Sequence, residues 1–179
     1  MKIAVIGAGI SGLTFAAAMR RFSPETQVEV YERDESLTSR PQGYSLGIKG
    51  DLGLVVLKTL GLYEHLAQEM GTIPNFVFCN QRGQHLLDLP SSGEEKRLTQ
   101  RVPRQALKAA LLQGVGPTTV HFGRHCTGYR QSAGGIEVHF EDGTSAQADY
   151  LVACDGVSSA LRQQLSGDEK HYLGLTSII

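Results

Sequence analysis

The chain has 179 residues, 41% of them hydrophobic and 20% charged, and its formal net charge is −1. This composition fits a single globular domain, and the balanced charge argues against a nucleic acid as a partner. No run approaches the ~18 apolar residues of a membrane span, and the N-terminus has no signal-peptide pattern. The three cysteines (Cys79, Cys126 and Cys154) share no metal-ligand spacing. We therefore expect a cytoplasmic protein with free thiols and no membrane contact.

The first part of the chain has the pattern of a strand, a helix and a second strand. Residues 2–6 form a short apolar run, typical of a strand buried on both faces. The alanine-rich segment 11–22 predicts a helix that Ser23 and Pro24 end. Residues 27–32 alternate polar and apolar side chains and predict a second strand, so we expect a βαβ unit with a parallel strand pair.

The middle of the chain predicts mainly helices, with one hairpin among them. Four elements are expected first: helices over 51–60 and 62–70, then hairpin strands over 76–79 and 85–89. Pro103 fits the first position of a further helix, which we expect to end at Gly114.

The last third predicts strands before a final helix. Three short strands with tight turns are expected between 120 and 149, followed by a strand and a helix over 150–165. The element order predicts an α/β Rossmann-like FAD/NAD(P)-binding fold with a parallel core sheet and an inserted β-meander.

A glycine-rich turn joins the first predicted strand to the first helix. The pattern GxGxxG permits a tight turn, a close backbone approach to a pyrophosphate and close helix packing. Glu32 lies twenty residues beyond the last glycine, where a carboxylate can accept hydrogen bonds from ribose hydroxyls. The alternative, a tight turn with an unrelated surface glutamate, does not explain why strand, turn, helix and acid agree. The candidate cofactor-binding residues here are Gly7, Ala8, Gly9, Ile10, Ser11, Gly12 and Glu32. They indicate a dinucleotide without separating FAD from NAD.

Four further residues favour a flavin dinucleotide. Arg33 follows Glu32, where a cation can lie near the adenosine end, and Arg40 is a second candidate for that place. Arg104 begins a predicted helix, from which a guanidinium can reach phosphate or flavin oxygens. Asp155 follows the last predicted strand and precedes Gly156. The alternatives are a solvated loop arginine for Arg40 and an N-cap aspartate on a surface helix for Asp155.

Together these stretches resemble the FAD-dependent aromatic hydroxylases, the class A flavoprotein monooxygenases that include para-hydroxybenzoate hydroxylase. The similar stretches are VIGAGISGL, VYERD, GYSLGIKGDLGLVVLKTLGL, RVPRQALKAALL and CDGVSSALR. The resemblance implies FAD as cofactor, NADPH or NADH as a transient reductant, and oxygen insertion from O₂ into an aromatic substrate. It implies that Arg104 contacts the flavin and that Asp155 faces the diphosphate–ribose region. No protein side chain is expected to act as a nucleophile, because the flavin carries the chemistry.

The chain resembles only the N-terminal portion of that family, since its later GD motif and main substrate-binding sheet do not follow. We expect an incomplete FAD-binding domain over 1–70 and 98–179, with the beginning of a substrate-binding layer over 71–97. Partners would then be a homodimer mate or a missing C-terminal portion. Two other readings stay open: a non-catalytic FAD- or nucleotide-binding fragment or half of a split enzyme, and a flavin-dependent reductase or halogenase.

Two histidines lie close together in the sequence. His121 and His125 are four residues apart in a predicted strand and turn, with no third ligand beside them. We expect both to be surface or packing histidines, and we expect no metal site.

Overall fold

The computed structural model describes residues 1–39, 43–72, 75–90, 99–116 and 119–174, the side chains of 75, 76 and 90 excepted. The chain divides into two compact units, Met1–Gln42 with Lys108–Ile179, and Gly43–Leu107. The two units are built differently. The first holds a parallel sheet with a β-meander, and the second holds antiparallel strands and short helices.

A four-stranded parallel sheet forms the centre of the first unit. Its strands are β1 (Lys2–Ile6), β2 (Gln27–Tyr31), β8 (Val120–His121) and β12 (Tyr150–Ala153), in the order β12-β1-β2-β8. Helix α1 (Ile10–Phe22) connects β1 to β2. Both neighbours of β1 run parallel to it. The predicted βαβ unit and parallel core sheet are therefore confirmed.

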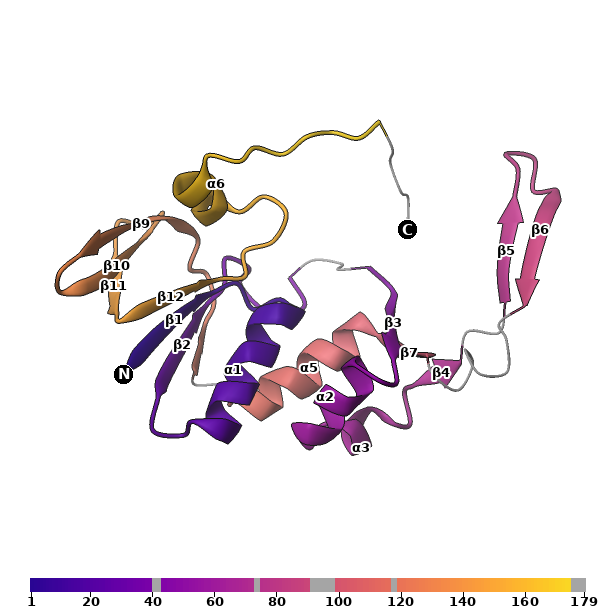
Figure 1. Cartoon of the computed structure of the whole chain (residues 1–179), viewed down its shortest axis with the longest axis horizontal. Coiled ribbons are helices and arrows are strands. Elements are labelled where there is room, and N and C mark those ends of the chain that lie inside the picture. The colour runs from indigo at the N-terminus through magenta and orange to yellow at the C-terminus, as the bar shows by residue number, and fades with distance from the viewer. Residues whose placement is uncertain (40–42, 73–74, 91–98, 117–118, 175–179) are drawn as a thin grey trace. The chain divides into compact units, whose positions relative to one another are not determined.

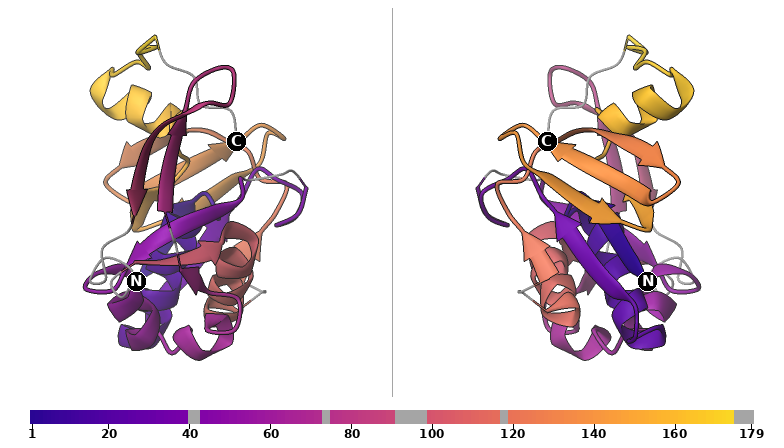
Figure 2. Two further views of the ribbon diagram at one scale, coloured as in Figure 1. Left: turned by 90° about the vertical axis from the view of Figure 1, so that its right-hand side faces the viewer. Right: turned by 90° about the vertical axis from the view of Figure 1, so that its left-hand side faces the viewer.

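The two faces of this sheet are covered by different elements. Ala4, Ile6 and Tyr31 project to one face, where they join a buried cluster with residues of the meander. Ile3, Val5 and Val30 alternate with them and project to the opposite face. Figures 1 and 2 show α1 on one side of β1 and β2 and the meander on the other. Both faces are thus covered, which explains why β1 is apolar after its first residue, Lys2.

The meander consists of β9 (Cys126–Ser132), β10 (Gly135–Phe140) and β11 (Ser145–Ala148), in the order β11-β10-β9. The expected turns lie between these strands. After β12 the chain forms helix α6 (Ala160–Ser166), whose Leu161 is buried in the same cluster as the meander. The predicted strand–strand–strand–strand–helix order is confirmed, with β8 as a separate short strand of the parallel sheet.

The second unit contains two small sheets. One has the order β3-β7-β4, and the other is a two-stranded hairpin. The unit comprises β3 (Ser45–Lys49), α2 (Gly53–Thr59), α3 (Tyr63–Leu66), β4 (Gly71–Thr72), β5 (Asn75–Cys79), β6 (His85–Pro90) and β7 (Thr99–Pro103). Helix α5 (Arg104–Val115) begins here and continues into the first unit. The predicted hairpin is confirmed.

Three strands of this unit were not predicted, and two helices are shorter than expected. Strands β3, β4 and β7 have mixed polarity and are held by partners far along the chain; Leu46, for example, pairs with Val102. Pro103 is the last residue of β7, so the helix begins one residue later. At that position, the missing proline N–H lies at the end of a strand and disturbs little of the ladder.

The end of α5 also differs from the prediction. Gly114 lies inside the helix, and the chain leaves it at Gly116, whose φ of 90° is left-handed. The side chain of Arg20 donates to the Val115 carbonyl oxygen at 2.7 Å. A cation from α1 therefore satisfies the last turn of α5, a tertiary contact that the local sequence does not indicate.

Glu29→Gln is expected to destabilise the chain at neutral pH by about 0.5–1 kcal/mol, because two donors lose a charged acceptor that solvent partly screens. Glu29 accepts hydrogen bonds from Gln27 at 2.9 Å and from His121 at 2.5 Å. Burial raises the pKa of Glu29, but the hydrogen bonds from Gln27 and His121 outweigh it, so the pKa lies below its ordinary 4.5. Ionised Glu29 therefore stabilises the fold above that ordinary value, and this contribution is lost as pH falls through the lowered pKa.

Urea unfolding of both proteins at about pH 7 and about pH 3 measures this difference. The two free energies of unfolding should converge in acid. A difference of the same size at both pH values would show that the charge of Glu29 plays no part.

Candidate nucleotide-binding site

A pocket of about 230 Å³ lies in the first unit, where β1, β2 and β12 end. Its walls come from four turns: Gly7 and Gly9 after β1, residues 32–34 after β2, residues 124–126 after β8, and residues 154–158 after β12. From β1 the chain crosses to β2 on one side, while β12 lies on the other. Ligands of open α/β sheets bind at such a switch point, outside the carboxyl ends of the strands. The pocket is smaller than the ~300–1,000 Å³ of a site that encloses a whole ligand, so it would hold one end of a dinucleotide.

The three motif glycines differ in what surrounds them. Gly7 has a φ of 104°, and a Cβ there would overlap the Cys154 carbonyl oxygen and lie 2.8 Å from its carbon. A Cβ at Gly12 would overlap the Gly7 carbonyl oxygen. A Cβ at Gly9 would have no atom within 4 Å, although Gly9 lines the pocket. Gly7 and Gly12 are therefore required by packing, whereas the space beside Gly9 is open to a ligand.

The start of α1 offers donors to an anion at this place. Gly9 is the N-cap residue, and no side chain caps the helix. The Leu13 N–H donates to the Gly9 carbonyl oxygen at 3.0 Å, so the N–H groups of residues 10–12 precede the first intrahelical bond. These groups and the helix dipole favour a negatively charged group. The glycine turn therefore fits a pyrophosphate.

Glu32 is a buried wall of the pocket, with 8% of its surface exposed. Its Oε2 accepts the Ala8 N–H at 2.7 Å, and its Oε1 accepts the Asp34 N–H at 3.0 Å. The carboxylate thereby joins the glycine turn to the end of β2. Because each carboxylate oxygen has a second lone pair, both oxygens can also accept a hydroxyl group. The surface-glutamate alternative is wrong.

The turn after β8 supplies wall residues that sequence reasoning missed. The Arg124 N–H donates to the Glu32 carbonyl oxygen at 2.7 Å, and the Gly123 N–H donates to that of Asp34 at 3.0 Å. The Arg124 guanidinium bonds Asp142, and His125 bonds Glu141 at 3.0 Å. The backbone of this turn therefore extends the end of β2, while both side chains bond to the meander. Lys108 of α5, with 5% of its surface exposed, also lines the pocket. The sequence offered one indication of Lys108: it lies four residues after Arg104, on the same face of the predicted helix.

Asp155 lines the pocket and does not cap α6. The cap is Ser159, whose hydroxyl accepts the Arg162 N–H at 2.9 Å, so the N-cap alternative for Asp155 is wrong. Burial and then the charge of Asp155 raise the pKa of the Cys154 thiol. Burial also raises the pKa of Cys126, and the charge of Asp155 contributes there too. Burial, with a smaller contribution from the charge of Asp155, therefore raises the pKa of both thiols of the pocket.

The remaining predicted residues divide between the units. Arg33 lines the pocket with Glu32. Arg104 begins α5, as predicted, but it belongs to the second unit, where its N–H donates to the Tyr44 carbonyl oxygen at 3.2 Å. Arg40 lies outside the described residues.

Within the described ranges, no group of three His, Cys, Asp or Glu side chains is arranged to hold a metal ion. His121 instead bonds Glu29 and stacks on Tyr31, with ring centroids 5.1 Å apart. Among the helices of the described residues, none has the length and apolar character needed to cross a membrane.

Residues 1–175 match the sequence model of the family described as "FAD binding domain". The chain belongs to the FAD-binding domain family. The matched residues make up nearly the whole sequence and include both units.

Individual proteins are similar to nearly the whole length of this chain. Monooxygenase cfoF of Aspergillus candidus is 33% identical over 196 residues, which cover 97% of this chain and 47% of cfoF. Aurachin C monooxygenase/isomerase of Stigmatella aurantiaca is 29% identical over 181 residues, which cover 99% of this chain and 46% of that protein. The crystal structure of Klebsiella pneumoniae HpxO complexed with FAD and uric acid superposes with a TM-score of 0.74 at 27% identity, over 96% of this chain and 43% of HpxO. The chain spans about half the length of the curated relatives it matches.

Proposed function

We propose that the chain binds FAD as the N-terminal part of a flavin-dependent monooxygenase that uses NADPH or NADH. The observation that carries the proposal is the open space beside Gly9, at an uncapped helix start and next to the buried carboxylate of Glu32. A pyrophosphate would occupy that space, and a ribose hydroxyl would bond to Glu32. Bound FAD supplies the electron transfer and the reaction with O₂.

The side chains of the pocket would hold the adenosine and diphosphate end of FAD. Residues 10–12 would donate N–H groups to the diphosphate, and Arg33 would lie beside the adenosine. A carboxylate next to a diphosphate repels it, so Asp155 would act through a water molecule or a neighbouring N–H group. We assign Arg104 and Arg40 to the same cofactor, because a guanidinium can bond phosphate or flavin oxygens with a bidentate fork.

The names of the relatives support a proposal for the substrate and the other partners. The relatives include a urate hydroxylase and 3-amino-4-hydroxybenzoate 2-monooxygenases by name. We propose an aromatic or polycyclic small molecule as substrate, with residues 71–97 as the first part of its binding layer and residues 1–70 and 98–179 as the FAD-binding domain. We also propose a cytoplasmic protein, completed by a homodimer mate or by a C-terminal portion.

One observation favours a second candidate, a binder of adenine nucleotides alone. The pocket of about 230 Å³ is formed by the residues assigned to the adenosine and diphosphate end. A chain that uses only this pocket would bind ADP as tightly as FAD. Titration with both ligands separates the two functions, because the monooxygenase proposal requires tighter binding of FAD.

FAD is expected to protect Cys154 from alkylation. Cys154 is partly exposed in the pocket, whereas Cys79 is exposed in the second unit and serves as the internal reference. If only the free form reacts, FAD at ten times its dissociation constant should slow modification of Cys154 about tenfold. Iodoacetamide labelling followed by peptide mass spectrometry measures both sites in one sample. Equal rates at Cys154 with and without saturating FAD would contradict the proposed site.

A further inference from the structure

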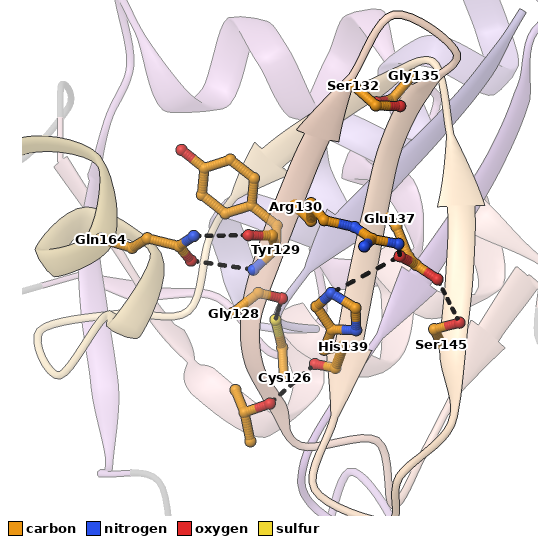
Figure 3. A network of polar contacts seen from close by, with 11 residues as sticks. Cys126, Gly128, Tyr129, Arg130, Ser132, Gly135, Glu137, His139, Ser145 and Gln164 are labelled. Atoms are coloured by element: carbon orange, nitrogen blue, oxygen red, sulfur yellow. Dashed lines mark hydrogen bonds and ion pairs between the residues drawn. The ribbon is translucent and has the colours of Figure 1, made fainter.

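One side chain of helix α6 hydrogen-bonds to the backbone of the meander. The Tyr129 N–H donates to Gln164 Oε1 at 3.0 Å, and Gln164 Nε2 donates to the Tyr129 carbonyl oxygen at 2.6 Å (Figure 3). Tyr129 belongs to β9, the outer strand of the meander. An outer strand has unpaired N–H and C=O groups. The Gln164 amide pairs with both groups of Tyr129, as an adjacent strand would.

Gly128, the neighbour of Tyr129, leaves the space that the exposed Gln164 side chain occupies. A Cβ at Gly128 would lie 3.0 Å from Gln164 Oε1, a tighter contact than most real Cβ atoms make. Three residues before Gln164 on the same helix, Leu161 has 2% of its surface exposed and lies in the cluster with Ile6 and Phe140. Residues three apart share one helix face. Leu161 therefore supplies the apolar contact of α6, and Gln164 supplies the polar one that fixes its register along β9.

The two segments joined by Gln164 both lead into the pocket. Residues 155–158 line the pocket and run directly into α6. Cys126 also lines it and is the first residue of β9. Two hydrogen bonds tie residues 155–158 to α6. The Arg162 side chain donates to the Val157 carbonyl oxygen at 3.1 Å, and the Arg162 N–H donates to the Ser159 hydroxyl that caps the helix. A shift of α6 along β9 would therefore carry the Asp155 loop with it.

We propose that Gln164 is a positioning residue of the nucleotide site. It sets the separation between the Asp155 loop and the Cys126 end of β9, and it contacts no ligand itself. The effect of Gln164 on FAD binding rests on the proposed function. The effect of Gln164 on the position of the Asp155 loop does not, because the rate of Cys154 alkylation in the ligand-free chain reports that position separately.

The test compares Gln164→Leu with Gln163→Leu, an exposed glutamine one residue earlier on the same helix. Gln164→Leu replaces the amide with a shorter apolar side chain and removes both hydrogen bonds. We expect it to weaken FAD binding about tenfold, the size of one or two net hydrogen bonds, and to change the rate of Cys154 alkylation in the ligand-free chain. Gln163→Leu should match the parent in both measurements.

Gln164→Glu supplies a readout that loss of stability alone does not move. At neutral pH its carboxylate faces the Tyr129 carbonyl oxygen and repels it, whereas the protonated acid donates to it as the amide does. From about pH 7 to about pH 4, the range in which a glutamic acid titrates, its properties should return towards those of the parent measured at the same pH.

Two results overturn the inference. One is that Gln164→Leu melts at a lower temperature but keeps the parental FAD affinity and the parental Cys154 reactivity, both measured well below that melting temperature. The other is a Gln164→Glu profile parallel to that of the parent. If the parent chain binds no FAD, the proposed function fails. The role of Gln164 is then decided by the Cys154 alkylation rate alone, which should change in Gln164→Leu and should return towards the parental rate in Gln164→Glu at low pH.

Discussion

Replacing Gly12 by alanine is expected to lower the free energy of unfolding by more than about 3 kcal/mol. The new Cβ would overlap the Gly7 carbonyl oxygen and lie 3.2 Å from the Gly7 carbonyl carbon and 3.3 Å from Cys154 Cβ. Two of these atoms belong to the backbone, so a change of rotamer brings no relief. Alanine favours a helix over glycine by about 1 kcal/mol, which is too little to offset the overlap. Circular dichroism and urea unfolding measure the loss.

Gly9→Ala is the matched control for this substitution. It makes the same chemical change in the same motif, but its Cβ meets no atom within 4 Å. The free energy of unfolding should change by less than about 1 kcal/mol, because the only loss is that alanine is a poorer N-cap residue than glycine. FAD affinity should fall, since the methyl group projects where the diphosphate would approach. Equal stability of the two variants would contradict the packing role of Gly12, and parental FAD affinity of Gly9→Ala would contradict the diphosphate site.

The second large effect is expected at Glu32. In Glu32→Ala the N–H groups of Ala8 and Asp34 lose their acceptors, and Ala8 is fully buried. Unsatisfied buried donors cost about 1–3 kcal/mol each, so the ligand-free chain should lose about 2–4 kcal/mol of stability. FAD binding should weaken at least about tenfold, because the charged ribose acceptor is removed as well.

Glu32→Gln separates the two roles. Its amide oxygen can accept one of the two N–H groups, but its NH₂ group faces the other, so stability should fall by less than in Glu32→Ala. Glu25→Ala, which removes an exposed carboxylate of the same unit, should leave both quantities unchanged. The assignment would be wrong if Glu32→Ala retained parental stability without ligand, since the two backbone hydrogen bonds would then contribute nothing.

The elements predicted correctly are those whose cause is local. The apolar run of β1, the glycines before α1 and the alternation in β2 lie within about thirty residues, so their pattern was sufficient. The hairpin and the meander also follow from neighbouring strands and turns. By contrast, β3 and β7 pair across fifty or more residues, Ser45 with Pro103 and Lys49 with Thr99. Neither strand has a pattern of its own that predicts it.

The site divides along the same line. The spacing of Glu32 from Gly12 indicated a pocket residue, yet the spacing did not reveal the hydrogen bonds of Glu32 to Ala8 and Asp34. Asp155 was expected to face the cofactor from its place after a strand, and it does line the pocket. Gln164 carried no signal, because its partner is a backbone segment thirty-five residues earlier. Side chains that hold two distant segments together become visible only in the folded chain.

The position of β1 between β2 and β12 has a consequence for synthesis on the ribosome. β1 finds its first partner within thirty residues, but its second, β12, begins at Tyr150. At about 5–20 residues per second, roughly six to twenty-five seconds separate the emergence of β2 and β12. During that interval one edge of an almost wholly apolar strand is open to other nascent chains, and the Cys154 wall against Gly7 does not yet exist. The pocket at the ends of β1, β2 and β12 therefore forms late. Binding of a dinucleotide can assist only the final docking of β12 and α6.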